Sequence, residues 1–352
     1  MPITYKCPSC GSAIMFDGTS QKLSCSSCGL EMPVQDYEQM FGRFTEEETV
    51  EYTNSFNEEP DMMNVKTYYC QSCGAELMSD EYSSAVMCSF CGNPSLVEDR
   101  LQGAYKPKLI IPFKINKEQA REIYMNWAKK GKLTPSELTS QSTIEKISGL
   151  YVPFWLYDYN ARSNMSVNAK RIRTTRRGDV EYTYTDHFYV YRDVEADFFK
   201  IPADASAKMN DDDMDKMEPY NYGEMQPFAM PYLSGYLSER YNFTSDQMLQ
   251  RVGARVNKYI TEITRNTIKG YDVVNVVNNQ VRMNNTRYDY ALLPVWVLNC
   301  RYNGKEFKFM LNGQTGKIVA DRPISKSKAF LWGFGIFTVL LLIMSLGGVL
   351  IW

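Results

Sequence analysis

Two cysteine-containing stretches specify the fold of the N-terminal part of this chain: Cys7-Pro8-Ser9-Cys10-Gly11 and Cys25-Ser26-Ser27-Cys28-Gly29. The same pattern returns as Cys70-Gln71-Ser72-Cys73-Gly74 and Cys88-Ser89-Phe90-Cys91-Gly92, with every cysteine displaced by 63 positions. Neighbouring pairs such as Met15 and Met78 keep the same displacement. A fixed displacement of this kind marks an internal repeat.

Each C-x2-C knuckle supplies two thiolates, and the glycine after it lets the backbone turn with a positive φ. Two knuckles separated by fourteen residues supply four sulfurs, close to the spacing of a zinc ribbon. We therefore predict two tandem zinc ribbons that each hold one structural Zn²⁺. The expected ligands are Cys7, Cys10, Cys25 and Cys28 in the first ribbon, and Cys70, Cys73, Cys88 and Cys91 in the second.

Other uses of these cysteines stay open at this point. Four thiolates also accept iron, and disulfides, a thioredoxin-like redox pair or an exchange of knuckles between the repeats are further alternatives. A four-sulfur site leaves no position for water or substrate, so we expect the metal to build the fold without doing chemistry. The ninth cysteine, Cys300, lies in an apolar run and is expected to be a buried, inert thiol. This cysteine usage indicates a reducing compartment.

Charge is distributed unevenly along the 352 residues. The formal net charge is -2, but residues 1–100 carry -11 and the remaining residues carry +9. Residues 34–66 form an acidic stretch that we expect to be a solvated linker between ribbon 1 (1–33) and ribbon 2 (67–100). An acidic N-terminal region is unsuited to a phosphate backbone, so a protein partner is expected and nucleic acid is not.

An uncharged run of 24 residues covers positions 329–352. As a helix it is about 36 Å long, enough to cross a hydrocarbon core of ~30 Å. Trp332 and Trp352 fall near its two ends, where interfacial aromatic residues belong. Basic residues from Lys317 to Lys328 precede it. The sequence therefore predicts one transmembrane anchor in the cytoplasmic membrane, with the body of the protein in the cytoplasm.

The segment 105–322 is predicted to be a β-rich α+β domain with a few amphipathic helices. Helices are expected after Asn116 up to Gly131, from the capping pattern of residues 134–137, and from Thr244 or Ser245 to Gly270. Residues 150–200 are expected to form a β-meander, and residues 290–298 a strand that repeats the pattern of residues 151–157. Asn312-Gly313-Gln314-Thr315-Gly316 is typical of a hairpin turn.

A basic strip, Lys170 to Arg177, precedes the turn signal Gly178-Asp179. The first interpretation is a solvated hairpin tip, followed by contact with anionic lipid or with an acidic partner, and last by nucleic acid.

We find no catalytic pattern in the sequence and predict that the protein is not an enzyme. The single histidine, His187, lies in a strand and lacks the partners of a general base. Gly316-Lys317 lacks the spacing of a phosphate loop. Asp211-Asp212-Asp213 lacks the glycine and terminal glutamate of an EF-hand and is expected to be a solvated acidic turn.

The combination of motifs resembles one family over essentially the whole chain. The motifs are the Tyr5 to Gly11 start, the second ribbon, 152–156, 293–299, 312–317 and the apolar terminal run. The resemblance is to bacterial TFIIB-type zinc-ribbon membrane proteins. It implies that the eight cysteines are zinc ligands, and that the protein recruits phage-shock protein A and an SPFH, flotillin-like protein to the membrane in the envelope stress response.

The sequence therefore favours a non-enzymatic, membrane-anchored zinc-ribbon adaptor or scaffold. Two alternatives from other classes are a membrane-bound regulator that binds nucleic acid, and a thiol-based redox or zinc sensor.

Overall fold

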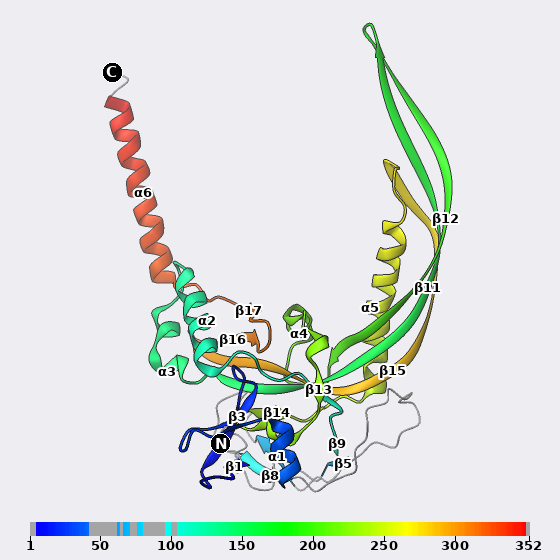
Figure 1. Cartoon of the computed structure of the whole chain (residues 1–352). Coiled ribbons are helices and arrows are strands. Elements are labelled where there is room, and N and C mark those ends of the chain that lie inside the picture. Colours follow the sequence, from blue (N-terminus) through cyan, green and yellow to red (C-terminus); the bar gives the residue numbers. More distant parts are fainter. Residues whose placement is uncertain are drawn as a thin grey trace.

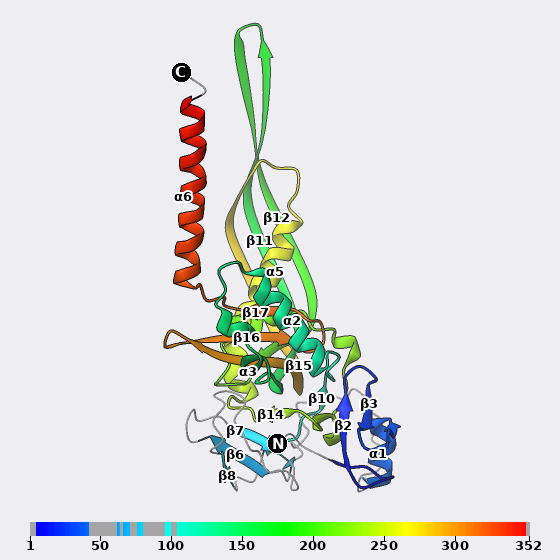
Figure 2. The same ribbon diagram turned by 90° about the vertical axis from the view of Figure 1, so that its left-hand side faces the viewer.

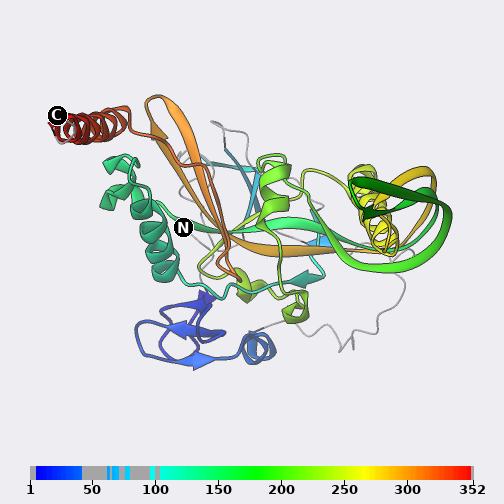
Figure 3. The ribbon, with the colours of Figure 1, turned by 90° about the horizontal axis from the view of Figure 1, so that it is seen from above.

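The structure, a computed structural model, describes residues 5–41, 62–63, 66–70, 76–79, 96–99 and 104–349. A β-rich body occupies the middle of the molecule (Figure 1). A long curved hairpin and the helix α6 rise from one side of this body, whereas the N-terminal region lies against the opposite side, as Figure 2 also shows. Seen from above, α6 and the hairpin stand at opposite ends of the body (Figure 3).

Two strands of thirty residues, β11 (Ser148–Arg177) and β15 (Val273–Tyr302), form the centre of the large sheet. They run antiparallel, with Leu150 opposite Val295 and Tyr151 opposite Pro294. The shorter strands of this sheet are β6 (Lys66–Cys70), β7 (Glu76–Ser79), β8 (Leu96–Asp99), β10 (Leu109–Ile110), β13 (Gln226–Pro227), β14 (Leu237–Glu239), β16 (Lys305–Asn312) and β17 (Ile318–Ala320). A separate pair joins β5 (Met62–Met63) to β9 (Ala104–Tyr105).

The two related apolar runs lie side by side in the sheet and are buried on both faces. The ring N–H groups of their tryptophans donate hydrogen bonds to main-chain carbonyls. Trp155 donates to the carbonyl of Phe243 at 2.8 Å, and Trp296 donates to that of Ile115 at 2.9 Å. Buried indole groups need such partners. The similarity seen in the sequence thus corresponds to two equivalent strands at the core of the body.

The expected β-meander over residues 150–200 is instead one very long hairpin of β11 and β12 (Val180–Asp204). No glycine or proline occurs between Pro153 and Gly178, so the strongest breakers are absent and the strand continues. The turn itself falls at Gly178-Asp179 as predicted, and Gly178 has a φ of 62°. Strand β15 accompanies β11 only as far as the pair Lys170 and Val273.

Two helices agree with the sequence prediction. Helix α2 (Lys117–Lys130) begins with a capping box at Asn116 and ends at Gly131. Helix α5 (Ser245–Asn266) is capped by Thr244 and packs its apolar face on β11, β12 and β15. The capping pattern of residues 134–137 does not start an α-helix: Pro135 precedes a short 3-10 helix, η2 (Ser136–Thr139), and α3 (Gln141–Ile144) follows. The Thr134 side chain is buried and is no cap.

Asp211 and Asp212 are exposed as predicted, but the backbone of Asp211–Asp213 is helical and does not form a separate turn. These residues form the first turn of α4 (Asp211–Met217), where Asn210 accepts a hydrogen bond from the N–H of Asp213 at 3.1 Å. Acidic side chains are favoured in a first helical turn because unpaired N–H groups point toward them. Two of the carboxylates of α4, Asp211 and Asp215, also pair with Arg251 of α5. The helix is therefore stabilised locally, by its capped and acidic first turn, and by ion pairs with Arg251 of α5.

The predicted turn at residues 312–316 is confirmed between β16 and β17. The N–H of Asn312 donates to the carbonyl of Lys317, and that of Gly316 to the carbonyl of Asn312. A Cβ atom at position 313 would lie only 2.6 Å from the ring of Phe113. Only glycine fits there.

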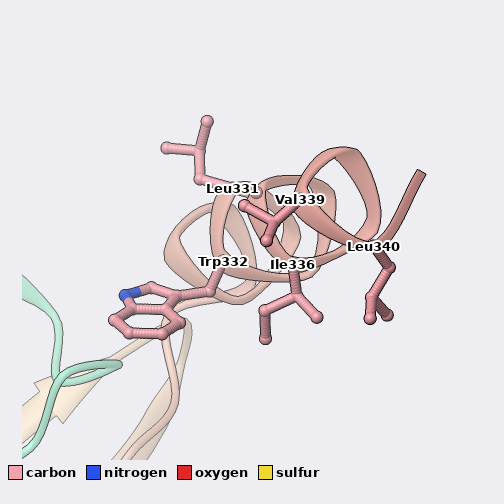
Figure 4. Close-up of a pocket in the computed structure, with 6 residues that line it drawn as sticks. Leu331, Trp332, Ile336, Val339 and Leu340 are labelled. Carbon is pink, nitrogen blue, oxygen red and sulfur yellow. The ribbon is translucent and has the colours of Figure 1, made fainter. Parts of the chain in front are cut away.

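Helix α6 (Lys326–Val349) stands apart from the body and is long and apolar enough to cross a membrane. Its side chains from Phe330 to Met344 are exposed apart from the half-buried Thr338. Figure 4 shows apolar residues of one flank around a shallow hollow: Leu331, Trp332, Ile336, Val339 and Leu340. The base of the helix is tied to the body, because the N–H of Ser325 donates to the carbonyl of Leu133 at 2.9 Å and Arg322 stacks on Trp127.

Candidate metal centre

The first four predicted ligands come together in a small antiparallel sheet. It consists of β1 (Tyr5–Lys6), β2 (Ala13–Asp17), β3 (Lys22–Cys25) and β4 (Glu31–Met32), in that order. One knuckle lies between β1 and β2, and the other between β3 and β4. Apolar side chains at Ile14 and Leu23 are fully buried beneath them.

Both knuckles have the same backbone geometry. In the first, the N–H of Gly11 donates to the carbonyl of Cys7 at 2.9 Å, and in the second that of Gly29 donates to Cys25 at 2.9 Å. Both glycines have a φ of 73°. This conformation is strained for residues with a Cβ, so the glycine after each C-x2-C pair shapes the turn that aims two sulfurs at one point.

The four Sγ atoms of Cys7, Cys10, Cys25 and Cys28 all lie within 4.8 Å of one another. Cys7 and Cys28 are 3.5 Å apart, and Cys10 and Cys25 are 3.6 Å apart. A tetrahedron with metal–sulfur bonds of about 2.3 Å has sulfur–sulfur edges of about 3.8 Å. The cluster therefore has the dimensions of a four-thiolate metal site.

The electrostatics of the cluster also fit a cation. The N–H and hydroxyl of Ser12 donate to the sulfur of Cys10 and lower its pKa to about 6. At Cys28 the N–H of Leu30 lowers the pKa, but the neighbouring sulfurs of Cys10 and Cys7 outweigh it and raise the pKa to about 12. Crowded thiolates repel one another, and a divalent cation among them removes that penalty.

Burial divides the ligands into two pairs. Cys7 and Cys25 are buried against the ribbon core, whereas Cys10 and Cys28 are exposed. The metal would thus be shielded on the side of the ribbon core and face solvent on the other.

Only Cys70 of the second predicted tetrad is described. It is buried at the end of β6, opposite Leu96 of β8. Cys73, Cys88 and Cys91 lie outside the described residues, so the second metal site stays a prediction. Strand β7 falls at the position that the 63-residue repeat gives it from β2.

The first ribbon is packed on the body, which the sequence did not indicate. The N–H of Phe16 donates to the carbonyl of Ser234 at 3.2 Å, and the Ser234 hydroxyl donates back to the carbonyl of Ile14 at 2.8 Å. The ring of Phe16 meets that of Tyr232, in the short helix η4 (Met230–Leu233), edge to face at 5.2 Å. Strand β2 is thereby joined to the segment before β14.

The hairpin loop between β2 and β3 makes a second attachment. The side chain of Gln21 donates to the carbonyl of Phe113 at 2.7 Å, and that of Asn116 donates to Thr19 at 3.0 Å. Residues 34–41 of the predicted acidic linker form the helix α1 (Val34–Phe41), whose Tyr37 hydroxyl donates to the carbonyl of Lys6 at 2.9 Å.

The second repeat uses its equivalent strand in the same way. Strand β7 pairs with β14, with Met78 opposite Ser238 and Leu77 opposite Glu239. The corresponding Met15 of the first repeat lies against Gly235. Both repeats therefore contact the single segment 232–239 from different sides, and β14 in turn pairs in parallel with β11.

Sequence reasoning also missed a polar network between α4, α5 and β12. Arg251 donates to the buried Asp204 at 2.7 Å and to Asp215 at 2.8 Å, while Arg255 donates to Glu218 at 2.8 Å. The helical spacing of the two arginines puts them on one side of α5. That spacing was the only available signal, because their partners come from elsewhere in the chain.

The other residues considered in the sequence do not join the cysteine cluster. His187 is exposed on β12, opposite Lys170. Cys300 is half-buried on β15, its thiol donates to the carbonyl of Phe307 at 3.4 Å, and burial raises its pKa.

Comparison with known proteins gives one relative that spans nearly the whole chain. No family model and no solved structure matches. The protein named uncharacterized protein YdjG, from Bacillus subtilis strain 168, is 38% identical over 338 residues, which is 96% of this chain and 94% of the relative. Similarity of this extent covers the cysteine cluster, the long strands and the apolar helix together. The chain therefore belongs to the protein family that includes YdjG.

Proposed function

We infer that this protein is a non-enzymatic adaptor that α6 holds in a membrane and whose zinc ribbons are its recognition surfaces. The observation that carries this proposal is the arrangement of the molecule. The first ribbon lies on the side of the body opposite α6 (Figures 1 and 2). A ribbon placed there points away from the membrane surface toward partners in solution.

The ribbon is also held in a fixed direction. Its strand β2 is tied to Ser234, and the base of α6 is tied to Leu133, so both attachments belong to the same body. A rigid connection lowers the ordering cost of capturing a partner, because little conformational freedom remains to be lost. This favours a scaffold over two domains on a free tether.

Charge supports a protein partner. Of the net charge of -11 on residues 1–100, the stretch 34–66 carries -7, ribbon 2 (67–100) carries -4, and ribbon 1 (1–33) is neutral. The acidic excess, which repels nucleic acid and suits a basic or polar protein surface, therefore belongs to the linker and the second ribbon. The basic residues Arg322, Lys326 and Lys328 before the apolar part of α6 favour a body on the cytoplasmic side. By resemblance, the proposed partners are phage-shock protein A and an SPFH, flotillin-like protein, in an envelope stress response, with TFIIB-type ribbons that each hold one zinc ion.

The experiment is affinity capture of the tagged full chain from crosslinked membranes after solubilisation in detergent, with and without nuclease. We expect the two partners to be recovered, with nuclease having no effect. The test variant carries Cys7→Ser and Cys10→Ser, and the matched control is Cys300→Ser, which makes the same chemical change outside the cluster. Partners should be lost from the test variant and retained by the control.

Two results would count against the adaptor. Recovery of nucleic acid, or of partners that disappear with nuclease, would favour the nucleic-acid regulator. Equal capture of partners by the cysteine variant and by the control would show that the first ribbon does not bind them.

A thiol sensor is the second candidate, and the exposure of Cys10 and Cys28 favours it. Exposed thiolates are the ones that oxidants reach. A sensor would release its metal at peroxide doses that leave ordinary exposed thiols reduced. Retention of the metal at doses that oxidise those thiols would exclude it.

A further inference from the structure

The outer part of the β11–β12 hairpin is a surface that the adaptor function does not use. Beyond the pair Lys170 and Val273 the sheet has only two strands, and every residue from 171 to 185 is exposed. No other described element covers it (Figure 1). This segment contains most of the basic strip.

The strand register sorts its side chains onto two faces, because directly opposed residues point to the same side. Arg173 is opposite Tyr184, Thr175 opposite Tyr182, and Arg177 opposite Val180. One face therefore combines cations with large amphipathic or apolar side chains. We name it the Arg–Tyr face, and it consists of Arg171, Arg173, Arg177, Val180, Tyr182 and Tyr184.

The Arg–Tyr face continues the buried face of the hairpin below it. Met165, Val167 and Ala169 alternate on that side and pack against the residues that follow α5. Arg171 marks the transition: its guanidinium stacks over Phe188 at 5.5 Å, and its Nε donates to the carbonyl of Gly270 at 3.1 Å. Above it the face is uncovered.

Positive charge dominates this face. The face carries three arginines and one acidic side chain, Asp186, which pairs with Arg173 at 3.0 Å. Its acidic neighbours are Asp179 in the turn and Asp272 at the edge, which accepts the N–H of Ile172 at 2.6 Å. Arginine with tyrosine suits a membrane interface, since guanidinium groups bind phosphate oxygens and tyrosine has an apolar ring with a polar end.

The position of the hairpin indicates what the Arg–Tyr face binds. The hairpin and α6 rise from the same side of the body in both perpendicular views (Figures 1 and 2). The hairpin extends at least as far from the body as α6 does, so insertion of α6 brings the hairpin to the membrane. We propose that the Arg–Tyr face binds the anionic headgroup surface of the same membrane that α6 enters. This proposal rests on α6 being inserted, and not on the identity of any protein partner.

The hairpin lies on the membrane and does not cross it. Its opposite face also carries charges, at Lys170, Arg176 and Glu181, and a two-stranded ribbon has unpaired backbone groups along both edges. Hydrocarbon tolerates neither. For the hairpin to rest along the headgroups, α6 has to turn at residues 321–325, which join β17 to α6 without helix or strand, and to give up the contacts of Ser325 with Leu133 and of Arg322 with Trp127.

The test is hydrogen exchange of the purified full chain in nanodiscs, read by mass spectrometry on peptides from residues 171–185. One set of discs contains phosphatidylcholine alone, and the other contains phosphatidylcholine with phosphatidylglycerol. We expect exchange to slow by about tenfold in the anionic discs only, and high salt to reverse the effect. Equal protection in both lipids, or none in either, would overturn the proposal.

Matched double variants test the face. Arg173→Gln with Arg177→Gln removes two cations from the Arg–Tyr face and should abolish the protection. Lys170→Gln with Arg176→Gln removes two cations from the opposite face and should preserve it. Equal losses in the two variants would refute the assignment to this face, while unchanged exchange of α5 peptides confirms that each variant is folded. If exchange of residues 171–185 slows only after an acidic protein is added, the Arg–Tyr face binds a protein and the lipid proposal is wrong.

Discussion

At the scale of single residues, two buried carboxyls carry the largest electrostatic cost in the body. Glu239 is 0% exposed and accepts a hydrogen bond from Ser206 at 2.8 Å on one oxygen. Its other oxygen has no partner among the described residues, and neither does Oδ2 of Asp204. Burial raises the pKa of Glu239 to about 8 and, despite Arg251, that of Asp204 to about 6. Unpaired buried charges are avoided by holding the proton.

The titration of Glu239 should make the protein less stable as pH rises. A folded-state pKa of about 8, above the ordinary 4.5, favours the protonated form, so this stabilisation is complete below pH 4.5 and is lost as pH rises toward 8. The loss amounts to roughly 3–5 kcal/mol. Glu239→Gln keeps an acceptor for Ser206 and removes the titration.

We therefore expect the melting temperature of Glu239→Gln minus that of the unmodified protein to increase from about pH 5 to about pH 9, roughly the range over which Glu239 titrates. Thermal unfolding of the full chain in detergent at several pH values measures this. A difference that does not change with pH would show that Glu239 is already compensated.

The cysteine cluster makes a second prediction at this scale. Cys7→Ser removes one sulfur from a closed four-thiolate site, and structural zinc contributes binding energy directly to folding. We expect the metal content of the purified chain to fall by one ion, measured by elemental mass spectrometry. Cys300→Ser, outside the cluster, should leave it unchanged. Equal metal content in Cys7→Ser and the unmodified chain would refute the ligand assignment.

At the scale of elements, α6 and the outer part of the β11–β12 hairpin lack a protein covering among the described residues. The side chains of α6 are apolar around the whole helix, whereas those of the outer hairpin are largely charged or aromatic. Helices satisfy their backbone groups internally and can enter hydrocarbon, but an open two-stranded ribbon cannot. The two proposals therefore assign membrane insertion to α6 and surface contact to the outer hairpin.

Deleting residues 329–352 should release the protein from membranes. The described part of this run is exposed, so its removal takes no side chain from the core of the body. Fractionation into soluble and membrane fractions tests the expectation. Persistent pelleting that disappears when Arg173→Gln and Arg177→Gln are added would assign the residual binding to the Arg–Tyr face. Pelleting that survives these changes would contradict the role of α6 as the anchor.

At the scale of the whole molecule, one short segment organises the arrangement. Residues 232–239 contact β2 of the first repeat and β7 of the second, and β14 within this segment pairs with β11. The two repeats are thus fastened to the body that also holds α6.

Loosening this junction should free the first ribbon without removing its metal. Phe16 is 4% exposed and packs on Tyr232, so Phe16→Ala should cost about 3–5 kcal/mol at the contact. We expect limited proteolysis to release the ribbon faster while metal content stays the same. Met40→Ala, at an exposed position, is the control. Loss of metal together with release would mean that Phe16 supports the cluster itself.

Features that depend on local spacing could be predicted from the amino-acid sequence. Cysteines two residues apart, followed by glycine, predicted the first cluster, and the capping residues Asn116 and Thr244 predicted the starts of α2 and α5. An uncharged run predicted α6. Each of these rests on contacts within a few residues, on helical periodicity or on a repeated motif, so no knowledge of distant partners was needed.

The placement of these parts could not be predicted in this way and is seen in the folded structure. The docking of β2 on Ser234, the pairing of β7 with β14, and the alignment of the hairpin with α6 join residues far apart in the chain. Strand pairing and burial depend on such partners, whose positions local propensity does not encode. For that reason the sequence predicted the ribbon as a separate module, and the fold made it part of the body.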